Sequence, residues 1–149
     1  MKKIVVLVLA GFSAAVVATA VIAQPDPIAA RKALMKANSD GARDLVAMMR
    51  GQVPFDAGKV DAVFGQWAET AQKLPGLFPD DSKSGGKTRA APKIWQDKAD
   101  FDAKATAFGT AVADNRDKAK GSLEALKAAI PVVGKGCDNC HEDYRLPAR

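Results

Sequence analysis

The sequence predicts an all-α protein built as an antiparallel four-helix bundle. Apolar residues recur at spacings of three and four over four separate segments, and proline and glycine punctuate the chain between them. No stretch alternates apolar and polar residues in the way of a half-buried strand. Because most connections are short, the four helices are expected to pack side by side in alternating directions. A chain of 149 residues suffices for one such domain.

Residues 1–23 are expected to be a signal peptide that is cleaved off. Lys2 and Lys3 give a positive start, an apolar run covers 4–22, and small side chains at its end match a signal-peptidase site. An uncleaved membrane anchor is the alternative reading, but mildly polar residues dilute the run and the cleavage motif directly follows it. Residues 24–149 then form the four-helix-bundle domain, exported and without stable membrane insertion after cleavage.

The charge pattern argues against nucleic acid as a partner. The whole chain carries a formal charge of +5, and loss of Lys2 and Lys3 with the signal peptide lowers it to +3. The remaining basic residues are scattered among acidic ones, with no run of five or six like charges.

The first two helices are bounded by recognisable signals. The first is expected from about Pro27 to Arg50, since proline suits a first turn and Gly51 follows. The second is expected to begin near Asp56, a suitable N-cap, and to stop at 74–76. One face of each helix is formed by Ile28, Arg31, Met35, Asn38, Ala42, Leu45 and Met49, and by Val60, Val63, Phe64, Trp67, Ala71 and Leu74.

The second half of the chain holds a long loop and two more helices. The polar segment 75–92 is expected to be a structureless connection, and loops of that length in small domains often cover something. One helix is expected to follow Pro92, and the last to start near Ser122 and to be kinked, without ending, at Pro131. Their apolar faces are Ile94, Trp95, Phe101, Ala105, Phe108 and Val112, and Leu123, Leu126, Ile130, Val133, Cys137, Cys140 and Tyr144.

The segment Cys137-Asp138-Asn139-Cys140-His141 reads C-x-x-C-H, the attachment motif of a c-type haem. Two thiols at this spacing add to the haem's vinyl groups, and the histidine that follows binds the iron. A thioredoxin-type redox pair would need a strand-to-helix context that is absent here. A zinc site would need a second Cys/His pair, and these are the only two cysteines and the only histidine. The sequence therefore predicts one haem c, bound covalently through Cys137 and Cys140, with His141 as an iron ligand.

A second protein ligand has to come from upstream of the motif, and methionine is the usual choice. In an antiparallel bundle the start of the first helix lies beside the end of the fourth. Met35 is about 12 Å along the first helix, level with His141, whereas Met49 is roughly 21 Å further on. Met48 and Met49 are thus expected in the core or on the surface. Met35 is the candidate, either bonded to the iron or packed over an empty face of the haem.

With these segments in view, the chain resembles the class II c-type cytochromes, the cytochrome c′ family, over essentially the whole mature length. The motif with the residues after it is the most specific element, and the others are individually weak but occur in the family's order. The matching segments are 31–36, 54–56, 77–79, 92–95 and 137–145. The resemblance implies a left-twisted four-helix bundle with the haem near one end, a periplasmic location, and a possible homodimer through the first two helices.

The resemblance also bears on the iron and on two arginines. One branch of the family is high-spin and five-coordinate and binds NO or CO; the other is low-spin, with a methionine ligand at the place where Met35 falls. Arg31 resembles the family's propionate-pairing arginine, with a solvated helix charge as the alternative. Arg145 resembles the arginine beside the proximal haem face, with a plain charge at the helix C-terminus as the alternative.

The function expected from the sequence is that of a one-electron carrier. A haem with His/Met ligation stays low-spin in both oxidation states, so little rearrangement accompanies electron transfer. The rival is a high-spin protein that captures NO or CO, and a haem-free interaction module is a third reading. No acid–base pair or nucleophile stands out, so an enzyme is not expected. The partners are then redox proteins, which the sequence does not identify.

Overall fold

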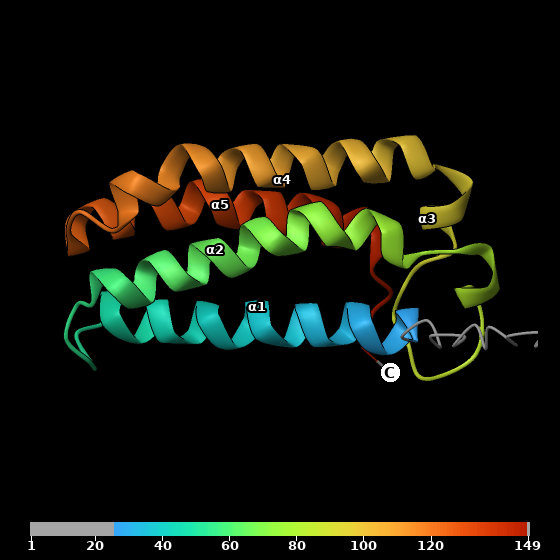
Figure 1. The fold of residues 1–149 in the computed structure, drawn as a ribbon, viewed down its shortest axis with the longest axis horizontal. Helices are drawn as coiled ribbons and strands as arrows, with labels where there is room; N and C mark the ends of the chain where they lie inside the picture. Colours follow the sequence, from blue (N-terminus) through green and yellow to red (C-terminus); the bar gives the residue numbers. More distant parts are fainter. Residues whose placement is uncertain (1–25, 149) are drawn as a thin grey trace, which may run out of the picture.

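Four long helices pack side by side in the computed structural model, which describes residues 26–148 (Figure 1). They are α1 (Pro27–Met49), α2 (Ala57–Lys73), α4 (Lys98–Ala119) and α5 (Leu123–Tyr144). In the described part of the chain α1 contacts α2 and α5, and α4 contacts α2 and α5. This confirms the predicted all-α four-helix bundle. The predicted signal peptide, residues 1–23, lies outside the described residues, and no helix within them is long and apolar enough to cross a membrane.

Three helices begin where side chains cap their free N–H groups. Asp26 accepts a hydrogen bond from the backbone N–H of Ile28 at 2.8 Å, and Asp56 accepts one from Lys59 at 2.9 Å. Ser122 accepts one from Ala125 at 3.1 Å. Such caps typically stabilise a helix by about 1 kcal/mol. The expected starts of the second and fourth helices are thus confirmed.

The end of α1 is set by Gly51, which has a φ of 69°. Its N–H donates to the carbonyl of Met48, and the N–H of Gln52 donates to that of Ala47. These two bonds form a Schellman motif, which needs a residue in the left-handed region and so favours glycine. The expected end of the first helix is therefore confirmed to within one residue.

The helix expected after Pro92 is interrupted, which corrects the sequence-based expectation. A short helix, α3 (Lys93–Gln96), ends at Asp97, and α4 starts with the next residue. Asp97 has a φ of −134° and a ψ of 61°, and its side chain accepts from the N–H of Asp100 at 3.3 Å. Asp97 therefore caps a new helix. The apolar spacing continues across the break, and for this reason periodicity alone missed it.

The expectation of a structureless connection over 75–92 is also wrong. Two 3₁₀ turns, η1 (Leu74–Leu77) and η2 (Asp80–Ser82), lie in or beside it. Phe78 between them is buried, and the indole N–H of Trp95 donates to its carbonyl at 2.9 Å. The segment is ordered because these apolar side chains and hydrogen bonds attach it to the bundle.

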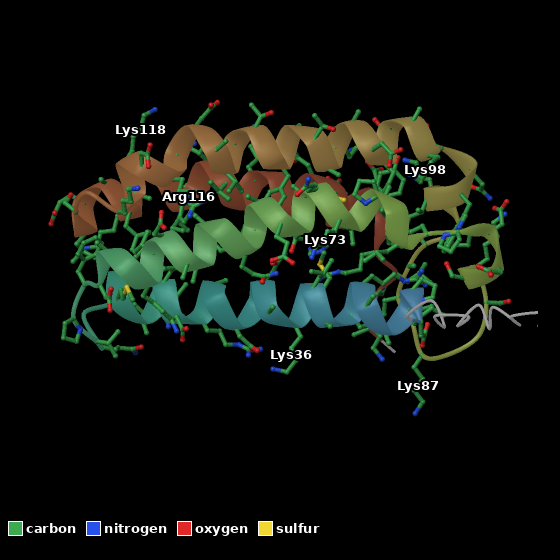
Figure 2. All side chains as sticks on the ribbon, in the orientation of Figure 1. Lys36, Lys73, Lys87, Lys98, Arg116 and Lys118 are labelled. Atoms are coloured by element: carbon green, nitrogen blue, oxygen red, sulfur yellow. The ribbon has the colours of Figure 1, made fainter. Side chains whose placement is uncertain are left out.

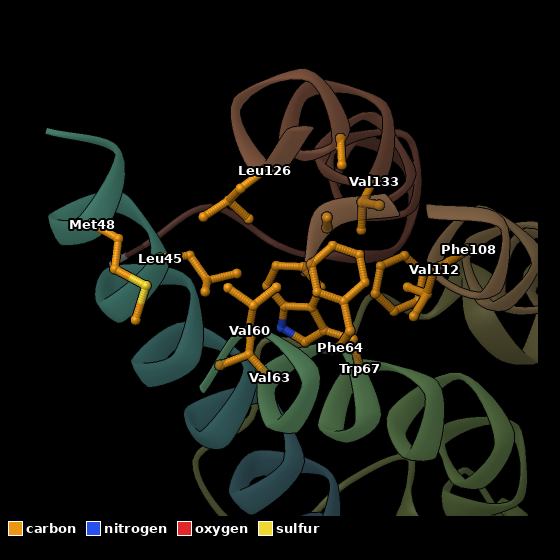
Figure 3. Packing of buried hydrophobic residues seen from close by; sticks show 12 residues of the cluster. Leu45, Met48, Val60, Val63, Phe64, Trp67, Phe108, Val112, Leu126 and Val133 are labelled. Carbon is orange, nitrogen blue, oxygen red and sulfur yellow. The ribbon is translucent and has the colours of Figure 1, made fainter. Parts of the chain in front are cut away.

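Buried side chains form two clusters, one toward each end of the bundle. The larger cluster fills the end that holds the α1–α2 turn and contains Leu45, Phe64 and Leu126 (Figure 3). The smaller cluster contains Leu74, Phe78, Ile94, Phe101 and Tyr144. Met48 is buried in the larger cluster and Met49 packs against it, so both lie in the core, as expected, and far from the smaller cluster.

An ion pair between α2 and α4 makes stability depend on pH. Arg116 donates to both oxygens of Asp61, at 2.8 and 2.9 Å, and this hydrogen bonding holds the pKa of Asp61 below its ordinary value. A carboxylate whose pKa is lower in the folded state stabilises the fold above its unfolded pKa, and loses this effect as pH falls through the folded value.

We therefore expect Asp61→Asn to lower the free energy of unfolding at pH 7. The deficit relative to wild type should shrink as pH falls below about 4, where the unfolded chain binds its proton. Urea titrations of both proteins at several pH values measure this. Asp114→Asn is a matched control, since Asp114 is exposed and makes no ion pair among the described residues. A deficit that stays constant with pH would contradict the expectation.

Candidate haem site

A cavity of about 630 Å³ opens at the end of the bundle that holds the smaller cluster. It is bounded by side chains of α1, α2, α4 and α5 and by the segment 87–90. The start of α1 and the end of α5 both lie at this end of the molecule (Figure 1). Its volume is within the range of about 300–1,000 Å³ typical of small-molecule and cofactor sites. Segment 87–90, part of the long connection between α2 and α3, forms one wall.

Helix α5 brings Cys137, Cys140 and His141 to this cavity together. Both cysteines are half-buried, and they form no disulfide with each other. Burial raises the pKa of Cys137 to about 11 and also raises the pKa of Cys140. Because a reactive redox cysteine depends on a stabilised thiolate, this environment argues against a thioredoxin-type centre. The arrangement instead supplies two adjacent neutral thiols on the wall of an apolar hollow.

The imidazole of His141 lies in the same wall and is half-buried. Burial lowers its pKa, and the positive charges of Arg145 and Arg89 act in the same direction. The neutral imidazole is the form that binds a metal. No group of three or more His, Cys, Asp or Glu side chains that could hold a metal ion occurs among residues 26–148.

Helix α1 contributes Met35, the only methionine among the described residues that lines the cavity. Met35 is half-buried and packs against the smaller cluster, as does Cys140. Met35 and His141 were expected at the same end of the bundle, and both line this one cavity. Whether the thioether bonds iron stays a prediction.

Arg31 is buried, with 4% of its surface exposed, and so is not a solvated helix charge. Its Nη1 donates to the carbonyl of Leu77 and to Oγ of Ser82, both at 3.0 Å, and its Nη2 donates to the carbonyl of Ser82 at 3.1 Å. The guanidinium also lies over the ring of Phe78, 4.6 Å from its centroid. Arg31 thereby ties the α2–α3 connection to the first helix.

The buried charge of Arg31 has no carboxylate partner among residues 26–148, since its hydrogen bonds go to carbonyls and hydroxyls. Its Nε has no hydrogen-bond partner there. Desolvation lowers the pKa of Arg31, which means that burial disfavours the charge. An anionic group in the cavity would relieve this cost, because buried charges are normally paired.

Arg145 is exposed and lines the cavity. It is the C-cap of α5, with extended backbone, and its N–H donates to the carbonyl of His141 at 3.2 Å. An isolated antiparallel β-bridge pairs Arg145 with Ala90, and the N–H of Leu146 donates to the carbonyl of Arg89 at 2.8 Å. The residues after His141 are thus attached to the segment that precedes α3.

Two polar features of this end had no role assigned from sequence. Asn38 and Thr70 line the cavity, and the Thr70 hydroxyl donates to Oδ1 of Asn38 at 2.9 Å. The helical spacing placed Asn38 on the face of Met35 but gave no sign of its partner Thr70 on the next helix. On the α4 side, Lys104 lines the cavity and binds Asp143, which Lys93 also contacts at 2.8 Å. No sequence signal joins these three residues, because they come from different helices.

The residues present fit a covalently bound haem. The cavity is mostly apolar and large enough, and two cysteines stand one turn apart on its wall beside an imidazole. The buried guanidinium of Arg31, whose Nε has no partner among residues 26–148, suits an anionic substituent. The fold and the site together define a c-type haem protein of the four-helix-bundle class.

The chain belongs to the cytochrome c′ family: the family model described as Cytochrome C' matches residues 26–145. It is 42% identical over 130 residues to a cytochrome c' of Rhodopseudomonas palustris, covering 83% of this chain and 84% of that protein. It is 41% identical over 132 residues to a cytochrome c-556 of the same organism, covering 86% and 88%. The solved structure of cytochrome c' from Rhodopseudomonas palustris superposes with a TM-score of 0.79 at 38% identity, covering 85% of this chain and all of that one. The protein is therefore a haem c protein, with Cys137 and Cys140 as its two cysteines.

Proposed function

We propose that the protein is a periplasmic one-electron carrier with a low-spin haem, whose axial ligands are His141 and Met35. The observation that supports this most directly is that a neutral imidazole from α5 and a thioether from α1 line one cavity. When bound, the haem iron supplies the one-electron couple. His/Met ligation raises the potential of such a couple.

The chain's own residues then have separate tasks in the proposal. Cys137 and Cys140 hold the cofactor covalently, and the apolar wall around Phe78 and Phe101 excludes water. Arg31 is proposed to pair with a haem propionate through its unpartnered Nε. Arg145 is proposed to lie beside the proximal side, since it follows His141 by one helical turn and caps the helix.

The test is the visible spectrum of the purified, reduced protein with and without carbon monoxide. A six-coordinate low-spin centre should give sharp, split bands that CO leaves unchanged, because Met35 occupies the distal position. A broad high-spin spectrum that shifts on CO addition would contradict the proposal and indicate a five-coordinate, gas-binding protein. The spectrum also separates the two kinds of relative, since the cytochrome c' and the cytochrome c-556 are about equally similar to this chain.

Family membership supports the remaining parts of the proposal. A signal peptide over residues 1–23 and residence in the periplasm fit a c-type haem, which is attached after export. The resemblance to the family also suggests a homodimer through α1 and α2, and the proposal of a carrier and not an enzyme rests on the lack of an evident acid–base pair or nucleophile in the sequence. The partners in this proposal are redox proteins.

A further inference from the structure

The cavity wall carries charge of one sign only. Six positively charged side chains line it, and no aspartate or glutamate does. Arg31 is buried and hydrogen-bonded within the protein, and Lys104 forms an ion pair with Asp143. The four that remain are exposed, and we refer to them as the basic rim: Lys32, Lys87, Arg89 and Arg145.

The basic rim differs from most of the protein's other cationic surface. None of its members makes an ion pair with a described carboxylate, whereas lysines elsewhere commonly do, as in the pairs Lys36–Asp40 and Lys98–Asp102. Unpaired, exposed cations keep their full field in solution and can accept carboxylates from another molecule.

Two acids border the rim on one side. Asp138 and Glu142 of α5 line a second, smaller hollow together with Arg89 and Arg145, and so offset part of their charge. Lys32 on α1 and Lys87 on the α2–α3 connection are outside that hollow. The strongest uncompensated positive charge is therefore expected on the side of the opening formed by α1 and the connection.

We propose that the basic rim is the docking surface for a redox partner protein, and that this partner presents a cluster of carboxylates. The proposal rests on the one-electron carrier function above. Electron transfer needs the partner close to the cofactor, and the exposed side chains of the rim line the cavity that the cysteines and His141 share with Met35. Charge complementarity at such a surface speeds encounter and orients the partner.

The experiment measures the rate at which the reduced holoprotein passes one electron to hexacyanoferrate(III), giving hexacyanoferrate(II), by stopped flow at several ionic strengths. The test variant is K32E/K87E. The matched control is K118E/K127E, with the same change in net charge at exposed lysines that make no ion pair among the described residues. Lys118 and Lys87 lie at opposite ends of the bundle (Figure 2). A cationic oxidant, tris(phenanthroline)cobalt(III), and added polyglutamate complete the design.

At low salt we expect K32E/K87E to react with hexacyanoferrate(III) roughly 3- to 10-fold more slowly than wild type, with a flatter dependence on ionic strength. The control should keep at least half of the wild-type rate, and the cobalt complex should show the opposite order. Polyglutamate should slow wild type and the control but not the rim variant. Each of these results supports the rim as a carboxylate-docking surface.

If K32E/K87E and K118E/K127E react with hexacyanoferrate(III) at equal rates, the proposal is overturned, because the net charge of the protein and not the position of the lysines would then determine the rate. A salt dependence without any effect of polyglutamate would also overturn it, since small anions but not an acidic polypeptide would use the rim. In both cases the carrier function would stand. A protein that exchanges electrons with neither oxidant would instead refute the carrier function itself.

Discussion

In the Met35→Ala variant we expect the haem to remain covalently attached while its spectrum changes to a high-spin form. The midpoint potential should fall by on the order of 0.1 V, a fraction of the roughly 0.8 V that axial ligands span in haem proteins. The reason is that a thioether stabilises the reduced iron, and no other methionine among the described residues lines the cavity. A redox titration with absorption spectra measures both effects, and CO should now bind to the reduced protein.

Met49→Ala is the control for this prediction. It removes the same side chain from the same helix, but at the end filled by the larger cluster. Its cost should appear in the free energy of unfolding, by about 1–3 kcal/mol for a half-buried methionine, and not in the spectrum or the potential. If Met35→Ala leaves the spectrum unchanged as well, then Met35 only packs over the haem, and the gas-binding alternative gains support.

Replacement of both cysteines by alanine should abolish covalent haem. Cys137 and Cys140 are the only cysteines in the chain, so no other thiol can form a thioether. In cells competent for cytochrome maturation, the wild-type polypeptide should carry one added porphyrin mass that survives acid–acetone extraction. The double variant should lose essentially all of it, as measured by intact-protein mass spectrometry.

Single variants sharpen this test. Cys137→Ala and Cys140→Ala should each retain at most one thioether, and their haem should show the altered spectrum of a remaining vinyl group. Far-ultraviolet circular dichroism controls for folding, because a variant that keeps α5 (Leu123–Tyr144) and the other helices should keep the helical signal of wild type. A double variant that keeps the porphyrin mass, or a wild type without it, would refute the attachment site.

The sequence predicted helix starts and ends where they depend on interactions between residues close together in the chain. Asp56 and Ser122 cap helices within three residues of themselves, and Gly51 ends a helix by its own backbone conformation. The break at Asp97 was missed although it is also local, because the apolar spacing continues across it and masks the cap. Periodicity reports which face is buried, but a helix can stop and restart without changing that face.

The haem site likewise has features that depend on neighbouring residues and features that depend on residues distant in the sequence. The C-x-x-C-H motif carries its chemistry within five residues, so it could be identified from sequence alone. The environment of Arg31 could not, because its partners Leu77, Ser82 and Thr88 lie 46 to 57 residues away. Asn38 and Thr70 likewise meet across two helices, 32 residues apart. Such contacts depend on how the helices pack, which spacing within one helix does not specify.

The two separate clusters of buried side chains have a consequence for biogenesis. One half of the bundle is closed by its own apolar side chains, whereas the other half is built around a hollow of about 630 Å³. We therefore expect the polypeptide to assemble the solid half first, with the α1–α2 turn and the start of α5 in place. On this expectation the terminal turns of α5 stay accessible for attachment of the porphyrin, whose insertion completes the remaining half.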